Sequence, residues 1–236
     1  MKPHSRIDAV FRRVATFFPT TPITLQGHQP DALCVVSIQP PILALTFPAA
    51  DAPPEHTFTV SAAGVHLTCS PTENKHVGDH VMLFATVNAI EVDYPFLQNP
   101  DALETLVDRW LTGLLPKTAW THAAHVAVTG YYAFDRDASQ VFAGMKQGIL
   151  HFNQCTGTLN GPDSGYHETL TRFWSDTITR AVHEARPASR FDAALCAARG
   201  FGEDRDLPAL FYSFNVVRDR AARRGWVAPD LEPDPQ

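Results

Sequence analysis

Three histidines and a glutamate stand near the starts of two predicted helices. TAWTHAAHVAVTGYY carries His122 and His125 three residues apart, and DSGYHETLTRFW carries His167 directly before Glu168. Positions three apart on a helix share a face, with about 5–6 Å between Cβ atoms, so His122 and His125 can aim their imidazoles at one point. His167 is in phase with the apolar residues of its own helix and should face inward. We therefore expect two helices to bring three imidazoles together.

This pattern is typical of a metal site between facing helices. Three histidines that leave a coordination position open suit a catalytic divalent metal such as zinc or iron. Glu168 would be the fourth ligand or a base acting on a metal-bound water, and Tyr132 would supply a hydroxyl donor from the stripe that carries the two histidines. The sequence thus predicts a small-molecule enzyme with His122, His125 and His167 as metal ligands. Hydrolase, lyase and oxygenase chemistry all stay open.

Two other interpretations fit the same residues. Without a metal, His122 or His167 paired with Glu168 would form an acid–base dyad, because imidazole has an ordinary pKa near ~6.5. Alternatively, each histidine is a hydrogen-bonded core residue, and Glu168 forms an ordinary helix ion pair with Arg172 four residues on. In the second case the chain would be a non-catalytic binding or assembly protein.

The composition narrows the class of protein. The formal net charge of −6 over 236 residues argues against a nucleic-acid binder. Apolar runs stay shorter than the ~20 residues that a membrane helix needs, and the N-terminus lacks the apolar segment of a signal peptide, so we expect a cytoplasmic protein. The four cysteines are scattered without a C-x-x-C pair, which predicts free thiols rather than a thiolate zinc site.

The two halves of the chain differ in the secondary structure that their residue patterns predict. Short apolar and β-branched runs separated by turn residues fill 20–93 and predict a small antiparallel barrel or meander, since no helical segment separates the strands. Helical periodicity follows. The expected helices begin near Asp101, near Thr121 and at Asp135 or Asp137, and then cover about 165–185, 189–198 and 207–223. Asp101 and Glu104 fit a capping box, and Thr121 fits an N-cap.

Four segments of the first half resemble the flavin reductase family of FMN-binding split β-barrels. They are FRRVATFFPT, VSIQPP, LTC and VGDHVMLFATVNAIEV, in the order in which the family has them. The resemblance implies a shortened split barrel, and a homodimer formed through it, because members of this family commonly dimerise. The β-strand that begins near His80 would be one of the family's late strands.

The flavin-contacting segment departs from the family. Where the family has a run of small hydroxyl-bearing residues before the Pro-Pro strand, this chain has QPDALC, with Pro30 and Asp31. A proline offers no N–H, and a carboxylate repels a phosphate. FMN binding is therefore an alternative function that these departures disfavour.

The second half is similar to a group of uncharacterised bacterial helical proteins that carry W-T-H-x-x-H and G-Y-H-E-T. This resemblance supports a real domain over about 105–231 and implies no established activity. Taken together, the sequence predicts an α+β protein: a split-barrel-like antiparallel domain over 1–98, followed by an α-helical bundle over 99–236 that carries the histidine and glutamate residues.

Overall fold

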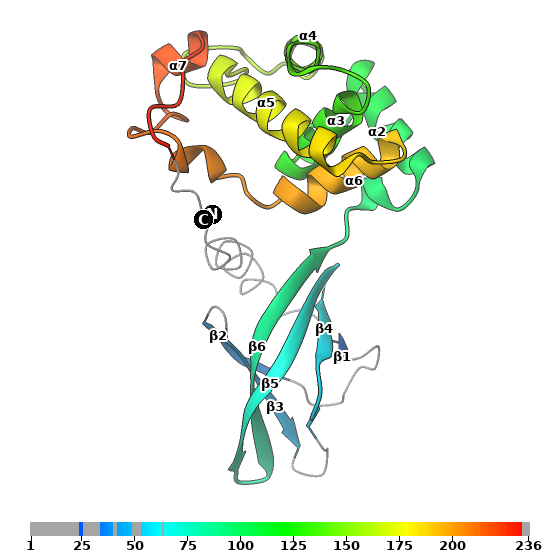
Figure 1. The fold of residues 1–236 in the computed structure, drawn as a ribbon, viewed down its shortest axis with the longest axis vertical. Helices are drawn as coiled ribbons and strands as arrows, with labels where there is room; N and C mark the ends of the chain where they lie inside the picture. Colours follow the sequence, from blue (N-terminus) through cyan, green and yellow to red (C-terminus); the bar gives the residue numbers. More distant parts are fainter. Residues whose placement is uncertain (1–23, 26–33, 40–41, 49–52, 63, 233–236) are drawn as a thin grey trace. The chain divides into compact units, whose positions relative to one another are not determined.

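The computed structural model describes residues 24–25, 34–39, 42–48, 53–62 and 64–232 (Figure 1). Its contacts divide the chain into a unit that ends at Asp93 and a unit that begins at Tyr94. We call them the β unit and the helical unit and describe each by itself. The protein is thus of mixed α+β class, with strands in the first unit and helices in the second.

Six described strands of the β unit form one sheet in the order β1-β4-β5-β6-β3-β2. Every neighbouring pair is antiparallel, as expected for strands that no helix separates. The strands are β1 (Thr24–Leu25), β2 (Cys34–Gln39), β3 (Ile42–Pro48), β4 (Phe58–Ala62), β5 (Val65–Val77) and β6 (His80–Val92).

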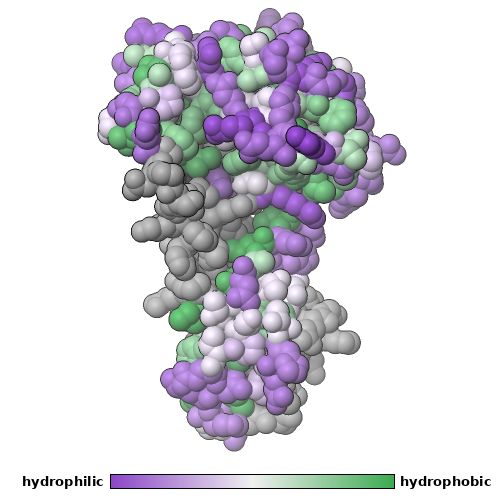
Figure 2. Space-filling view, viewed as in Figure 1, coloured by the Kyte–Doolittle hydropathy of each residue, from purple (hydrophilic) through white to green (hydrophobic). Residues whose placement is uncertain are grey.

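The core of the sheet follows from period-two alternation along its central strands. Along β6, Val81, Leu83, Ala85 and Val87 are buried, while the residues between them are only half-buried. The far part of β5, Thr72–Val77, is exposed, and Figure 2 shows hydrophilic side chains over this end of the hairpin. Other buried side chains of the same sheet are Leu43, Leu45, Phe58, Val60, Leu67 and Cys69.

The helical unit is built from five longer helices and shorter turns. The helices are α2 (Pro100–Leu111), α3 (His122–Ala133), α4 (Ala138–Cys155), α5 (Glu168–Ala185), α6 (Arg190–Phe201) and the short α7 (Arg220–Arg224), with 3-10 turns η1 (Pro95–Leu97), η2 (Lys117–Ala119) and η3 (Leu207–Leu210). Helix α3 contacts α4, α5 and α6, and ten of its residues are buried. It is therefore the central element of the unit.

Two glycines allow close helix packing. A Cβ on Gly130 of α3 would lie 2.6 Å from the Cβ of Ala197 on α6, and a Cβ on Gly148 of α4 would lie 2.0 Å from the Trp110 ring. Both distances are too short for a side chain to be added. Because glycine has no side chain, the neighbouring elements can approach α3 and α4 closely at these two positions.

The helices differ from the expected ones in two places. Asn99, not Asp101, caps α2, because its side chain accepts the backbone N–H of Ala102 at 2.9 Å. The expected helix over 207–223 was wrong: η3 and α7 flank an irregular segment there. Thr121 caps α3 as predicted, and Asp137 caps α4 in a capping box with Gln140.

Candidate functional site

His122 begins α3, is half-buried and acts as a hydrogen-bond donor. Its Nε2 lies 3.2 Å from the carbonyl oxygen of Phe201, at the end of α6, and because a carbonyl only accepts, Nε2 carries the proton. The ring centroid lies 4.9 Å from that of Trp174. Burial lowers the pKa of His122 to about 4, so this imidazole is neutral at physiological pH.

His125 lies one turn further along α3 in an aromatic stack. Its ring is stacked on Trp120 at a centroid distance of 5.3 Å, and Trp120 is stacked in turn on Trp110 at 5.0 Å. Burial, and to a smaller extent the neighbouring His122, lowers the pKa of His125 to about 3. The environment of this imidazole is thus an apolar aromatic one.

His167 caps the start of α5, and both of its ring nitrogens are engaged. Nε2 donates to the carbonyl oxygen of Val216 at 3.0 Å, while Nδ1 accepts the backbone N–H of Leu170 at 3.3 Å. One donor and one acceptor define a neutral imidazole. The residue is 6% exposed, and burial lowers the pKa of its imidazole.

The three predicted ligands are held by different partners rather than gathered around one point. The Nε2–H groups of His122 and His167 donate to the carbonyl oxygens of different segments. Within the part of the chain that the structure describes, no group of three His, Cys, Asp or Glu side chains is placed to hold a metal ion. The residues do not fit a three-histidine centre in this arrangement, and the metal assignment stays a prediction without geometric support.

Glu168, the predicted base, lies instead in a cluster with a lysine and a tyrosine. Its Oε2 accepts from Lys146 Nζ at 2.8 Å and from the Tyr166 hydroxyl at 2.9 Å. The side chain of Glu168 is 18% exposed and that of Lys146 is 40% exposed. Burial, and then the bond to Glu168, raises the pKa of Tyr166, so its hydroxyl keeps its proton. We call Lys146, Tyr166 and Glu168 the Glu168 cluster.

The expected helix pair between Glu168 and Arg172 is replaced by other contacts. Arg172 forms a long ion pair with Asp176, with 3.7 Å between nitrogen and oxygen, and its guanidinium lies over the rings of Phe142 and Trp226 at 5.8 and 5.1 Å. Lys146 Nζ also lies 5.7 Å from the centroids of Phe142 and Tyr166. Lys146 and Arg172 thus share the Phe142 ring, and of these two cations Lys146 is the one that pairs with the Glu168 carboxylate.

The loop before α5 is fixed by specific hydrogen bonds. Asn160 Oδ1 accepts the backbone N–H of Tyr166 at 2.9 Å and Asn153 Nδ2 at 2.7 Å. Arg223 donates to the carbonyl oxygens of Gly165 and Tyr166. Gly165 has φ +73°, and a Cβ there would lie 2.5 Å from Asn160 Oδ1, so glycine is required. These bonds hold the backbone of the loop that carries Tyr166.

Tyr132, the other predicted catalytic residue, lies on α3 with different neighbours. The Arg136 guanidinium stacks over its ring at 4.4 Å, and the Trp110 ring meets it edge-on at a centroid distance of 6.3 Å. Burial raises the pKa of its hydroxyl. These contacts give Tyr132 a packing role, and its predicted catalytic role has no supporting contact among them.

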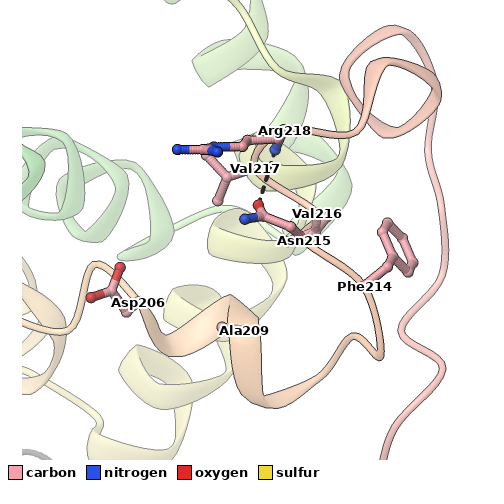
Figure 3. Close-up of a pocket in the computed structure, with 7 residues that line it drawn as sticks. All are labelled: Asp206, Ala209, Phe214, Asn215, Val216, Val217 and Arg218. Carbon is pink, nitrogen blue, oxygen red and sulfur yellow. Dashed lines mark hydrogen bonds between the residues drawn. The ribbon is translucent and has the colours of Figure 1, made fainter.

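A surface pocket of about 460 Å³ lies beside the segment that His167 holds. Asp206 and Ala209 line it from the η3 region, and the rest of its wall is the segment Phe214–Arg218 (Figure 3). Asn215 Oδ1 accepts the backbone N–H of Arg218 at 3.2 Å, and Arg223 donates to the Val217 carbonyl. The bond from His167 to Val216 thus fixes one wall of this pocket.

Sequence reasoning missed Lys146 and the role of Tyr166 as the partner of Glu168. Lys146 follows Met145 on an amphipathic helix, and a single lysine there carries no signal. Its contact with Glu168 spans 22 residues, so only the packing of α4 on α5 reveals it. The flavin-contacting segment, including Pro30 and Asp31, lies outside the described residues.

Comparison with known proteins gave no relative for this chain: no protein family, curated protein or solved structure matched it. Among the helices of the described ranges, none is both long and apolar enough to cross a membrane.

Proposed function

We propose that the helical unit is a small-molecule enzyme domain that performs metal-free acid–base chemistry at the Glu168 cluster. The observation that carries the proposal is the convergence of Lys146 Nζ and the Tyr166 hydroxyl on Glu168 Oε2. Three ionisable groups from α4, α5 and the loop before α5 meet at one oxygen atom. Such grouping of acid, base and neutral donor is common where proton transfer occurs.

Each member of the cluster has a separate task in this proposal. Glu168 takes a carbon-bound proton from the substrate, because its carboxylate is an acceptor that a small molecule can reach at the exposed edge. Lys146 pairs with the carboxylate and uses its other N–H groups to bind an anionic group of the substrate. Tyr166, whose pKa is raised by burial, donates a hydrogen bond and fixes the carboxylate orientation.

The surroundings indicate the kind of substrate. Lys146 and Arg172 supply two positive charges, and the Phe142 and Trp226 rings supply flat apolar surface next to them. A small anionic molecule with an aromatic or other planar part would satisfy both features. The pocket in Figure 3 belongs to the same unit, and His167, the residue before Glu168, is hydrogen-bonded to Val216 in its wall.

Glu168→Gln is the variant that tests this proposal. The full-length protein is incubated with a mixture of small anionic metabolites, and consumption of each compound is followed by mass spectrometry. We expect conversion of at least one compound by the wild type and loss of that conversion, on the order of 10²-fold or more, in Glu168→Gln. Equal conversion by both proteins would contradict the proposal, as would no conversion of any compound.

Glu104→Gln is the matched control. Glu104 Oε2 on α2 accepts the Tyr131 hydroxyl at 3.0 Å, so this variant removes the charge of another tyrosine-bonded glutamate in the same unit. We expect it to convert the same compound at the wild-type rate. If conversion fell merely because a negative charge or stability was lost, the conversion rates of both variants would fall together.

We further propose that the β unit is a shortened split barrel of flavin-reductase type and that the helices form a bundle. The antiparallel sheet and the β2–β3 pairing, in which Gln39 pairs with Ile42, support the first part. FMN binding and a homodimer through this unit would follow from that relationship. A yellow visible spectrum of the purified protein would support the flavin hypothesis, and a colourless protein that stays colourless with added FMN would contradict it.

A further inference from the structure

A serine, a histidine and an aspartate form a continuous hydrogen-bonded chain in the β unit. Ser61 Oγ lies 2.7 Å from His66 Nδ1, and His66 Nε2 lies 2.8 Å from Asp93 Oδ2. The side chains of His66 and Asp93 are 34% and 72% exposed. A reagent in solution can therefore reach this group.

The sheet register brings the three residues together. Ser61 of β4 and His66 of β5 are direct cross-strand partners next to the tight turn between these strands, so their side chains share a face. Asp93 follows β6 directly, and its backbone N–H donates to the carbonyl oxygen of Gly64 at 2.7 Å. Gly64 has φ +77°, which glycine adopts without strain. The turn and the end of β6 are thus held beside each other.

The partners determine where the imidazole proton lies in the neutral ring. A carboxylate only accepts, so Nε2 of His66 carries the hydrogen and donates it to Asp93. Nδ1 then has a lone pair and accepts the hydroxyl hydrogen of Ser61. A carboxylate that orients an imidazole, which in turn accepts a serine hydroxyl, can activate serine as a nucleophile, and here Nδ1 accepts the hydroxyl while Nε2 faces the carboxylate.

We propose that Ser61, His66 and Asp93 form an acyl-transfer site for small activated esters. Ser61 Oγ would attack the ester carbonyl while His66 Nδ1 takes its proton. The carbon–oxygen bond to the leaving alcohol then breaks, and the alcohol leaves with the proton from His66. Water attacks the acyl-serine in the same manner and releases the acid. Asp93 holds the ring orientation and stabilises the imidazolium formed in between.

A fluorophosphonate probe on the full-length protein tests this proposal. The probe reacts with an activated serine by forming an oxygen–phosphorus bond and expelling fluoride, and the hydroxyl proton passes to His66. We expect peptide mass spectrometry to locate the label on Ser61. Ser61→Ala should abolish labelling of that peptide, and His66→Gln should slow it on the order of 10²-fold, because general-base assistance is lost.

Asp93→Asn and Ser70→Ala complete the test. Asp93 is well exposed, so Asp93→Asn should leave the fold intact and still slow labelling at least about 10-fold, since an amide no longer fixes the ring tautomer. Ser70 lies on β5, the strand of His66, but is bonded to Thr57 and Asn88 instead of an imidazole, so Ser70→Ala should label at the wild-type rate. Absence of label on Ser61, or labelling of Asp93→Asn at the wild-type rate, would show that the three residues only fasten the hairpin and would overturn the proposal.

Discussion

At the scale of single residues, the three predicted histidines stabilise the helical unit. His122 and His167 donate to carbonyl oxygens that lie 79 and 49 residues away along the chain, and His125 packs in an aromatic stack. Spacing correctly placed His122 and His125 at the start of one helix. The spacing could not reveal carbonyl partners so distant in sequence. Those partners make His122 and His167 hydrogen-bond donors.

His167→Ala should lower the free energy of unfolding of the helical unit by about 1–3 kcal/mol. The substitution leaves the Val216 carbonyl without its donor and removes the N-cap acceptor of α5. His167→Asn should recover part of the loss, since asparagine is a good N-cap. Urea unfolding measures the effect, and His183→Ala, an exposed residue with one bond to the Ala133 carbonyl, should cost less. A His167→Ala protein as stable as the wild type would refute this role.

The buried histidines should make stability depend on pH. Burial lowers the pKa of His122 to about 4 and that of His125 to about 3, whereas in the unfolded chain both have the ordinary value near ~6.5. Between these values the unfolded state binds more protons, so the free energy of unfolding falls as pH decreases from about 6.5 to about 4. Each residue contributes up to about 1.4 kcal/mol per pH unit.

His122→Gln checks this pH dependence. Glutamine can still donate to the Phe201 carbonyl but does not titrate, so the variant should lose stability less steeply with falling pH. Urea unfolding, followed by tryptophan fluorescence between about pH 7 and about pH 4.5, measures the slope. An unchanged slope would mean that His122 is not a buried neutral group.

At the scale of elements, helix caps and apolar periodicity predicted α3, α4 and α5, but not the region after α6. Thr121 and Asp137 mark the starts of α3 and α4 in sequence and in structure. His167 as the cap of α5 was not predicted, because histidine is not a usual N-cap. Segment 207–223 contains Pro208 and Asn215, which favour turns, and the structure has a turn, an irregular stretch and a short helix there.

Two glycines of the same helix should respond to alanine in opposite directions. A Cβ on Gly148 would lie 2.0 Å from the Trp110 ring, whereas a Cβ on Gly144 would have only Arg136 within 4 Å, at 3.8 Å. Gly148→Ala should therefore lower stability by about 1–3 kcal/mol, and Gly144→Ala should raise it by up to about 1 kcal/mol. Far-UV circular dichroism during urea unfolding tests both, and a stabilising Gly148→Ala would contradict the packing described for α4.

At the scale of the whole molecule, the change in residue pattern along the sequence predicted strands followed by helices, and the structure has both in that order. The contacts place the division after Asp93. All four tryptophans, Trp110, Trp120, Trp174 and Trp226, lie in the helical unit. Tryptophan fluorescence therefore reports on the unfolding of that unit alone.

A fragment covering residues 94–236 should fold by itself. Its core residues contact one another within the unit, so it should unfold cooperatively and with about the same urea midpoint as the full chain. Tryptophan fluorescence and far-UV circular dichroism make the comparison. A fragment that is unfolded without the first 93 residues would show that the helical unit depends on the β unit.

Deuterium incorporation tests the acid–base claim most directly. The compound that the wild-type protein converts is incubated in D₂O with the wild type and with Glu168→Gln, and mass spectrometry follows the exchange of its carbon-bound hydrogen. Proton transfer by the Glu168 cluster predicts a gain of one mass unit in substrate or product with the wild type and on the order of 10²-fold slower gain with Glu168→Gln. Equal incorporation with both proteins, or conversion without any incorporation, would contradict the claim.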